Sequence, residues 1–235
     1  MDAYHQLIAT IALMMGASWA AGINLYATIG VLGILGATGN IVLPEPLLVL
    51  QNPLVIGAAS LMYIVEFFAD KTPGVDTGWD TIHTFIRIPA GVMLAAGAVG
   101  EVNPAVAITA GILGGTISAT SHTLKTGSRI LINTSPEPFS NWIASVFEDV
   151  AVFAGLWAAL HAPLLFLGLF CLFILLTILL LPKIWQVIKA LFIRLKQCVT
   201  TPPPPPPDNH NPSKPETSKS YTTPEDTTHP LANNQ

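Results

Sequence analysis

The chain has 235 residues, of which 51% are hydrophobic and 10% are charged, and its mean hydropathy is +0.57. A soluble domain has about a quarter of its residues charged, so this composition excludes an ordinary soluble protein and predicts a polytopic membrane protein. The net charge is −4, and the two cysteines have neither a disulfide nor a metal-site spacing.

Six apolar stretches are expected to cross the membrane as helices, because most of them reach the roughly 20 residues that the hydrocarbon core requires. In chain order they are residues 6–37, 53–68, 79–100, 105–132, 142–160 and 164–181. The first would be about 48 Å long as one helix, so we expect it to be steeply tilted or broken near its middle, where Gly22 and Asn24 lie. The last is leucine-rich and is expected to face lipid.

The second and third spans are joined by a polar stretch with seven ionisable side chains: Glu66, Asp70, Lys71, Asp76, Asp80, His83 and Arg87. Positions 80, 83, 84 and 87 recur at helical spacing and share one face. They are therefore expected to enter the bundle as one polar stripe. Asp80 is expected to cap the third span, and Asp76 to form the turn before it.

The second half of the chain repeats features of the first. Residues 114–126 align with residues 16–28, so that small residues match and His122 lies over Asn24. Glu148 on the fifth span then corresponds to Glu66 on the second. With three spans in each half, the second half would be inverted. We therefore predict an all-α bundle of about six spans with a 3+3 inverted repeat, in which the first and fourth helices are interrupted. Generic packing of small residues is the alternative explanation.

Several motifs resemble a known family. They include Glu66-Phe67, the Pro73-Gly74-Val75-Asp76 turn, Trp79-Asp80, the loop 133–141 with its two prolines, and Glu148-Asp149. Together they look like the bacterial integral-membrane family called domain of unknown function 4126, over about residues 10–162. The resemblance implies a multi-span inner-membrane protein and no established activity.

Ionisable residues inside a membrane span are candidates for a functional site, because each costs about 2.5 to 3.5 kcal/mol on insertion scales. We expect a buried site in which Glu66, Asp70, Glu148 and Asp149 bind a proton or a cation. The other predicted members of the site are Asn24, Asp80, His83, Arg87, His122, Lys125 and Arg129. The two histidines could add ligands for a divalent cation, although neither lies in a metal motif, and no other cofactor is expected.

Three kinds of function remain open for this pattern. The first is a transporter or permease for a small solute or cation, and the second is a membrane scaffold whose charges form structural ion pairs. The third is a membrane-embedded hydrolase, although the sequence has no phosphate-binding loop and no metalloprotease or serine-hydrolase motif. The expected partners are the lipid bilayer and a small solute, proton or cation. Self-association stays open, and no nucleic acid is expected.

The chain is expected to divide into a helical membrane domain (1–182), a basic juxtamembrane helix (183–200) and a proline-rich tail (201–235). The composition of the tail predicts disorder, and its proline run is a candidate for recruiting a partner. With six spans, all the lysines and arginines from Lys71 to Lys196 fall on one side, while the turns at Pro44, Glu101 and His161 carry none. The positive-inside rule then predicts that both termini are cytoplasmic, in the cell inner membrane.

Overall fold

The computed structural model describes residues 3–72, 74–133 and 138–200, and its regular elements there are all helical. They are α1 (Ala3–Ile23), α2 (Leu25–Ala37), the short 3-10 helix η1 (Glu45–Gln51), α3 (Pro53–Ala69), α4 (Val75–Ala98), α5 (Pro104–Ile132), α6 (Pro138–His161) and α7 (Pro163–Thr200). Among these described residues, five helices are long and apolar enough to cross a membrane, or six if the bent pair of η1 and α3 is one span. The predicted all-α, multi-pass bundle is confirmed.

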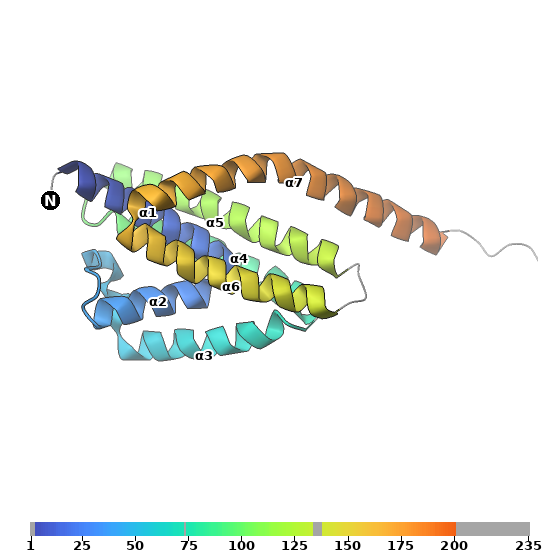
Figure 1. Cartoon of the computed structure of the whole chain (residues 1–235), viewed down its shortest axis with the longest axis horizontal. Helices are drawn as coiled ribbons and strands as arrows, with labels where there is room; N and C mark the ends of the chain where they lie inside the picture. The colour runs from blue at the N-terminus through green and yellow to red at the C-terminus, as the bar shows by residue number, and fades with distance from the viewer. Residues whose placement is uncertain (1–2, 73, 134–137, 201–235) are drawn as a thin grey trace, which may run out of the picture.

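The bundle has two ends that differ in composition (Figure 1). At the polar end, as we call it, α3 and α5 finish and α4 and α6 begin. At the opposite end lie the loop before η1, the α4–α5 turn and the α6–α7 turn. Two Asn-Pro pairs start helices from that opposite end: the side chains of Asn52 and Asn103 accept hydrogen bonds of 2.9 Å from the backbone of α3 and α5. Proline at the first helical position has no amide hydrogen that needs a partner there.

The first apolar stretch does not cross the bundle as one helix, because it breaks at Asn24 and turns back (Figure 1). The Asn24 backbone is extended, with φ −144° and ψ 97°, and its side chain accepts a 2.9 Å hydrogen bond from the amide of Ala27. This cap ends α1 and begins α2. The return is confirmed by a cleft at the opposite end, lined both by Gln6 near the start of α1 and by Leu43 just after α2. We call α1 and α2 the re-entrant hairpin.

Helix α1 packs along α5, and the two helices run in the same direction. A Cβ added to Gly114 would lie 2.7 Å from the Ser18 hydroxyl, and one added to Gly22 would lie 2.0 Å from the Ser121 hydroxyl. The contacts therefore advance along both helices together, and α5 continues without a break from Pro104 to Ile132. The predicted inverted repeat and the interruption of the fourth helix are wrong. The small residues that suggested them let parallel neighbours approach closely.

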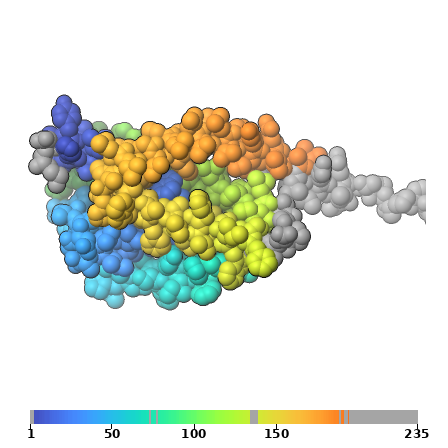
Figure 2. Space-filling model, in the orientation of Figure 1, coloured from blue at the N-terminus to red at the C-terminus, as the bar shows by residue number. Residues whose placement is uncertain are grey.

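The two ends of the described chain lie at opposite ends of the bundle. Helix α1 begins at the opposite end, whereas α7 runs along the outside of the bundle and finishes past the polar end (Figures 1 and 2). The prediction that both termini share one side counted residues 6–37 as one crossing, whereas these residues form two helices that break at Asn24. The orientation of the termini stays a prediction. Helix α7 continues without interruption through the predicted boundary at residue 182. The predicted tail, residues 201–235, lies outside the described residues.

Helix α4 begins earlier than predicted. Its N-cap is Gly74, whose φ of 86° is a conformation that glycine adopts without the strain of a Cβ. Asp80 is consequently inside the helix and fully buried, so it does not cap the third span. Asp76 does act at the turn, since its Oδ1 accepts a 2.9 Å hydrogen bond from the amide of Gly74.

The half of the bundle that lies farther from the polar end is packed with apolar side chains. Leu32 is fully buried there, and Leu43, Leu47 and Leu94 are each 4% exposed in the same cluster. In a water-soluble protein, burial of one aliphatic side chain stabilises the fold by about 1.5 to 3 kcal/mol. Lipid is itself apolar, so this cluster stabilises the bundle mainly by close packing. The charged side chains are left to gather at the polar end.

Candidate functional site

Seven charged side chains form one ion network at the polar end: Glu66, Asp70, Asp80, Arg87, Lys125, Arg129 and Glu148. They come from the end of α3, the first half and the middle of α4, the last turns of α5 and the middle of α6. Six of the side chains are at most 4% exposed, and Glu148 keeps 16% of its surface exposed. Glu148 is thus the member with the most access from outside.

Lys125 lies at the centre of the ion network. The distances from its Nζ are 2.7 Å to Asp70, 3.5 Å to Glu66, 3.6 Å to Asp80 and 3.9 Å to Glu148. The same ammonium donates a 3.1 Å hydrogen bond to the carbonyl oxygen of Ile23, the last residue of α1. One side chain therefore connects the tip of the re-entrant hairpin to carboxylates from three other elements.

Arg87 joins the carboxylates to a histidine. Its guanidinium pairs with Glu66 and lies 3.0 Å from Asp80, and Nη1 is 3.1 Å from Nδ1 of His122. Arginine can only donate, so Nδ1 accepts and the neutral imidazole carries its proton on Nε2. That nitrogen donates to the hydroxyl of Thr84 at 2.6 Å, and Thr84 donates to the carbonyl of residue 80 at 3.0 Å. These contacts favour the tautomer of His122 with its proton on Nε2.

Arg129 connects the ion network to the loops at the polar end. Its Nη2 is 2.6 Å from Glu148, and its Nη1 donates to the carbonyl of Asp70 at 3.1 Å and to both oxygens of Asn141. Asn141 and Asn133 in turn donate to the carboxylate of Asp76 at 3.3 and 3.0 Å. Residues on both sides of the loop that resembled the family motif are thus tied to the start of α4.

Three further predicted site residues lie beside the ion network: Asn24, Asp149 and His83. The Asn24 amide donates to Oδ1 of Asp149 at 3.1 Å, which links the hairpin tip to α6. His83 Nδ1 donates to the carbonyl of Trp79 at 2.9 Å, so its Nε2 accepts from the Tyr26 hydroxyl at 3.1 Å. The imidazole also stacks on the Trp79 ring, with the centroids 4.3 Å apart.

A fourth buried base, Lys71, lies in the turn between α3 and α4. Its ammonium donates to Ser145 at 3.2 Å and to the carbonyl of Phe67 at 3.3 Å, and it lies 3.0 Å from the centroid of the Phe67 ring. Burial lowers the pKa of Lys71 by disfavouring the ammonium, while the nearby carboxylates of Asp149 and Asp70 oppose this change.

Carboxylates outnumber bases at the polar end. Glu66, Asp70, Asp76, Asp80, Glu148 and Asp149 face Lys71, Arg87, Lys125 and Arg129. In the part of the chain that the structure describes, at least one buried carboxylate oxygen has no hydrogen-bond partner on each of four residues: Glu66, Asp70, Asp80 and Asp149. A buried acceptor without a partner costs about 1 to 3 kcal/mol. The arrangement therefore favours uptake of a proton or a cation.

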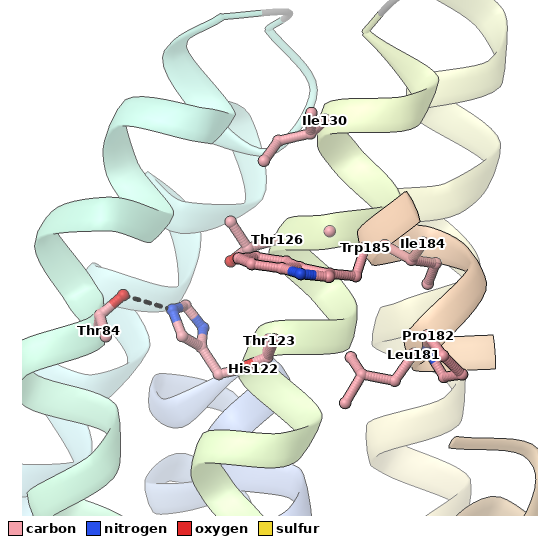
Figure 3. A pocket seen from close by; sticks show the side chains of 10 residues that line it. Thr84, His122, Thr123, Thr126, Ile130, Leu181, Pro182, Ile184 and Trp185 are labelled. Carbon is pink, nitrogen blue, oxygen red and sulfur yellow. Dashed lines mark hydrogen bonds between the residues drawn. The ribbon is translucent and has the colours of Figure 1, made fainter. Parts of the chain in front are cut away.

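An apolar groove of about 620 Å³ reaches the ion network from one side, between α4, α5 and α7. Figure 3 shows Thr84 and His122 turned toward each other at one end of it, and the indole of Trp185 beside Thr126. Ile130, Leu181 and Ile184 supply apolar walls. His122, which lines the groove, contacts Arg87 of the ion network.

The structure brings all the predicted site residues to the polar end. His122 and the seven members of the ion network are connected to one another. The Asn24–Asp149 pair and His83 lie beside this network. Among the described residues no three His, Cys, Asp or Glu side chains form a metal site, and the possible binding of a divalent cation stays a prediction. Sequence reasoning missed the roles of Tyr26, Asn141 and Ser145. Thr84 had a signal, since it shares the polar face of α4.

These features define a multi-pass helical membrane protein with a buried ion network at the tip of the re-entrant hairpin. Residues 11–183 match the family described as Domain of unknown function (DUF4126), and the chain belongs to that family. This confirms the resemblance seen in the motifs and extends it into the last span. No match was found among the curated proteins or among the solved structures.

Proposed function

We propose that the protein is a permease for a small solute or cation, and that the carboxylates of the ion network take up a proton or cation during transport. The observation that carries this proposal is the excess of buried carboxylates over buried bases, with acceptor oxygens that lack partners. Ionisable groups inside membrane bundles commonly form ion or proton pathways. Glu66, Asp70, Glu148 and Asp149 are the proposed binding groups, with Asn24, His83 and His122 as secondary ligands.

Two features of the architecture support transport. The break at Asn24 places a helix C-terminus and a helix N-terminus at the depth of the ion network, and transporters use such discontinuous helices to bind ions and substrates. The groove beside His122 has the size of small-molecule sites, which are about 300 to 1,000 Å³. It provides a place where a solute contacts the network through one side chain.

Flux measurements on protein reconstituted in liposomes test this proposal. We expect uptake of a solute or cation, or movement of protons, that Glu66→Gln and Glu148→Gln reduce at least tenfold because the acid that binds the ion is gone. Glu101→Gln, in the exposed α4–α5 turn, is the matched control and should keep wild-type flux. Unchanged flux in both network variants, with each variant monodisperse in detergent, would remove the roles assigned to these acids.

We further propose that the polar end faces the cytoplasm of a bacterial inner membrane. In the described part of the chain, the lysines and arginines lie between Lys71 and Lys196, on segments that begin or finish at that end, and the described turns at the opposite end have none, in keeping with the positive-inside rule. The start of α1 would then be outside the cell and the end of α7 inside.

Thiol labelling in intact cells checks this orientation. In a background with Cys171 and Cys198 changed to Ala, Tyr4→Cys should react with a membrane-impermeant maleimide added from outside. Thr72→Cys, an exposed residue at the polar end, should react only after lysis. Labelling of both positions from the same side would contradict the re-entrant hairpin, and the reverse pattern would invert the proposed topology.

A membrane scaffold is the second candidate function. The observation that favours it is that two buried bases, Arg87 and Lys125, each contact carboxylates from more than one helix, as expected of ion pairs that hold a bundle together. In that case substitutions in the network would change stability and no flux would be found. A hydrolase has less support, because neither histidine has a carboxylate as its hydrogen-bond partner among the described residues.

A further inference from the structure

The surroundings of the Lys125 ammonium have the composition of a cation site. Four carboxylates lie 2.7 to 3.9 Å from Nζ, and the carbonyl of Ile23 lies 3.1 Å away. An ammonium can donate only three hydrogen bonds, and two are directed at Asp70 and Ile23. Glu66, Asp80 and Glu148 lie farther away, at 3.5 to 3.9 Å, and attract it mainly through their charge.

The Ile23 carbonyl is an independent indication of a cation. Helix α1 ends at this residue, so its last carbonyls have no continuing helix to bond, and they carry the negative end of the helix dipole. Helix ends of this kind coordinate cations in transporters built on broken helices. Glu66 and Asp80, both fully buried, each retain an oxygen without a hydrogen-bond partner in the described part of the chain.

The size of the site selects the class of cation. Calcium requires oxygens at about 2.3 to 2.6 Å and magnesium at about 2.0 to 2.1 Å, whereas the oxygens around Nζ start at 2.7 Å. An ammonium already fills this space in the form of the lysine head group. The spacing therefore suits a large monovalent cation better than a small divalent one.

We propose that Lys125 is a tethered occupant of a site for ammonium-sized monovalent cations, and that a transported cation exchanges with its head group. This inference rests on the proposed permease function and names its substrate class. The ligands are the carboxylates of Glu66, Asp70, Asp80 and Glu148 together with the carbonyl of Ile23. When the lysine head group leaves, the site keeps its negative charge and its oxygen ligands.

Thermal unfolding of purified Lys125→Ala in detergent tests the site without any flux assay. Ammonium or methylammonium chloride should raise its Tm in a saturable way, by about 5 to 10 °C at a hundred times Kd. N-methyl-D-glucamine chloride at equal ionic strength should not. Wild-type protein, with the site filled by its own lysine, should respond little, and so should the control Lys183→Ala, whose lysine is exposed on α7.

A second variant separates specific binding from relief of excess charge. Lys125→Ala combined with Glu66→Gln restores the wild-type charge balance but replaces one carboxylate ligand with a neutral amide, so its response to ammonium should fall at least threefold. An equal response to every salt would overturn the proposal, as would stabilisation of Lys125→Ala by acid but not by ammonium. Aggregation of Lys125→Ala in all salts, ammonium included, would also count against it.

The two proposals fail separately. Ammonium binding by Lys125→Ala, with no flux through the wild-type protein, would remove the permease and keep the cation site. Flux through the wild-type protein, with no ammonium response in Lys125→Ala, would remove the tethered-cation site and leave the permease.

Discussion

Replacing Arg87 with Met is expected to lower the free energy of unfolding by about 3 to 5 kcal/mol, the cost of removing one partner from a buried ion pair. The guanidinium is fully buried and contacts Glu66, Asp80 and His122. Met retains much of the apolar volume, so the loss reports mainly on the two carboxylates left behind. Lys125, at 3.5 and 3.6 Å, compensates only in part. Denaturant unfolding in mixed micelles measures the change.

Two further variants serve as controls for Arg87→Met. Arg87→Met with Glu66→Gln should recover a substantial part of the loss, because it removes one of the stranded charges. Lys183→Met, on the exposed surface of α7, should stay within about 0.5 kcal/mol of the wild type. A cost below about 1 kcal/mol for Arg87→Met would mean that the two carboxylates are already protonated or hydrated. Flux that survives in the stable double variant would show that Glu66 and Arg87 hold the bundle together and do not bind the transported ion.

The polar end could be predicted from the sequence because membrane burial makes each charge conspicuous. Glu66, Asp80, Arg87 and Lys125 stand out in apolar stretches, and the spacing of positions 80 to 87 placed Asp80 and Arg87 on one helix face. These side chains meet because a charge inside a membrane bundle needs a partner. Their convergence needed no knowledge of the order in which the helices pack.

The path of the chain could not be predicted in the same way. Residues 6–37 are mostly apolar, and Gly22 and Asn24 indicated a possible break, but hydropathy does not distinguish a broken crossing from a hairpin that turns back. The decision depends on Asn24, which caps α2 and finds Asp149, a partner 125 positions away in the sequence. The repeat was misread for a related reason: Gly22 and Gly114 are small because helices approach there, and such packing does not depend on helix direction.

Asn24→Ala is the second substitution with a large expected effect, because one side chain performs two tasks at the break. Its oxygen caps α2 by accepting from Ala27, and its amide donates to Asp149. Loss of an N-cap costs about 1 kcal/mol, and a buried carboxylate left without its donor costs about 1 to 3 kcal/mol. Together they predict a loss of roughly 2 to 4 kcal/mol in unfolding free energy.

Asn52→Ala is the matched control for that substitution. Asn52 caps α3 through the amide of Leu54 with the same 2.9 Å geometry, but it lies on the surface and has no buried acid to satisfy. Its loss should cost about 1 kcal/mol, so the difference between the two variants isolates the link to Asp149. Asn24→Ala should also weaken the response of the Lys125→Ala background to ammonium, because the Ile23 carbonyl is presented only while the helix is broken beside it. Equal costs at the two caps, with the ammonium response unchanged, would show that Asn24 merely starts a helix and that the hairpin tip is held in place by packing alone.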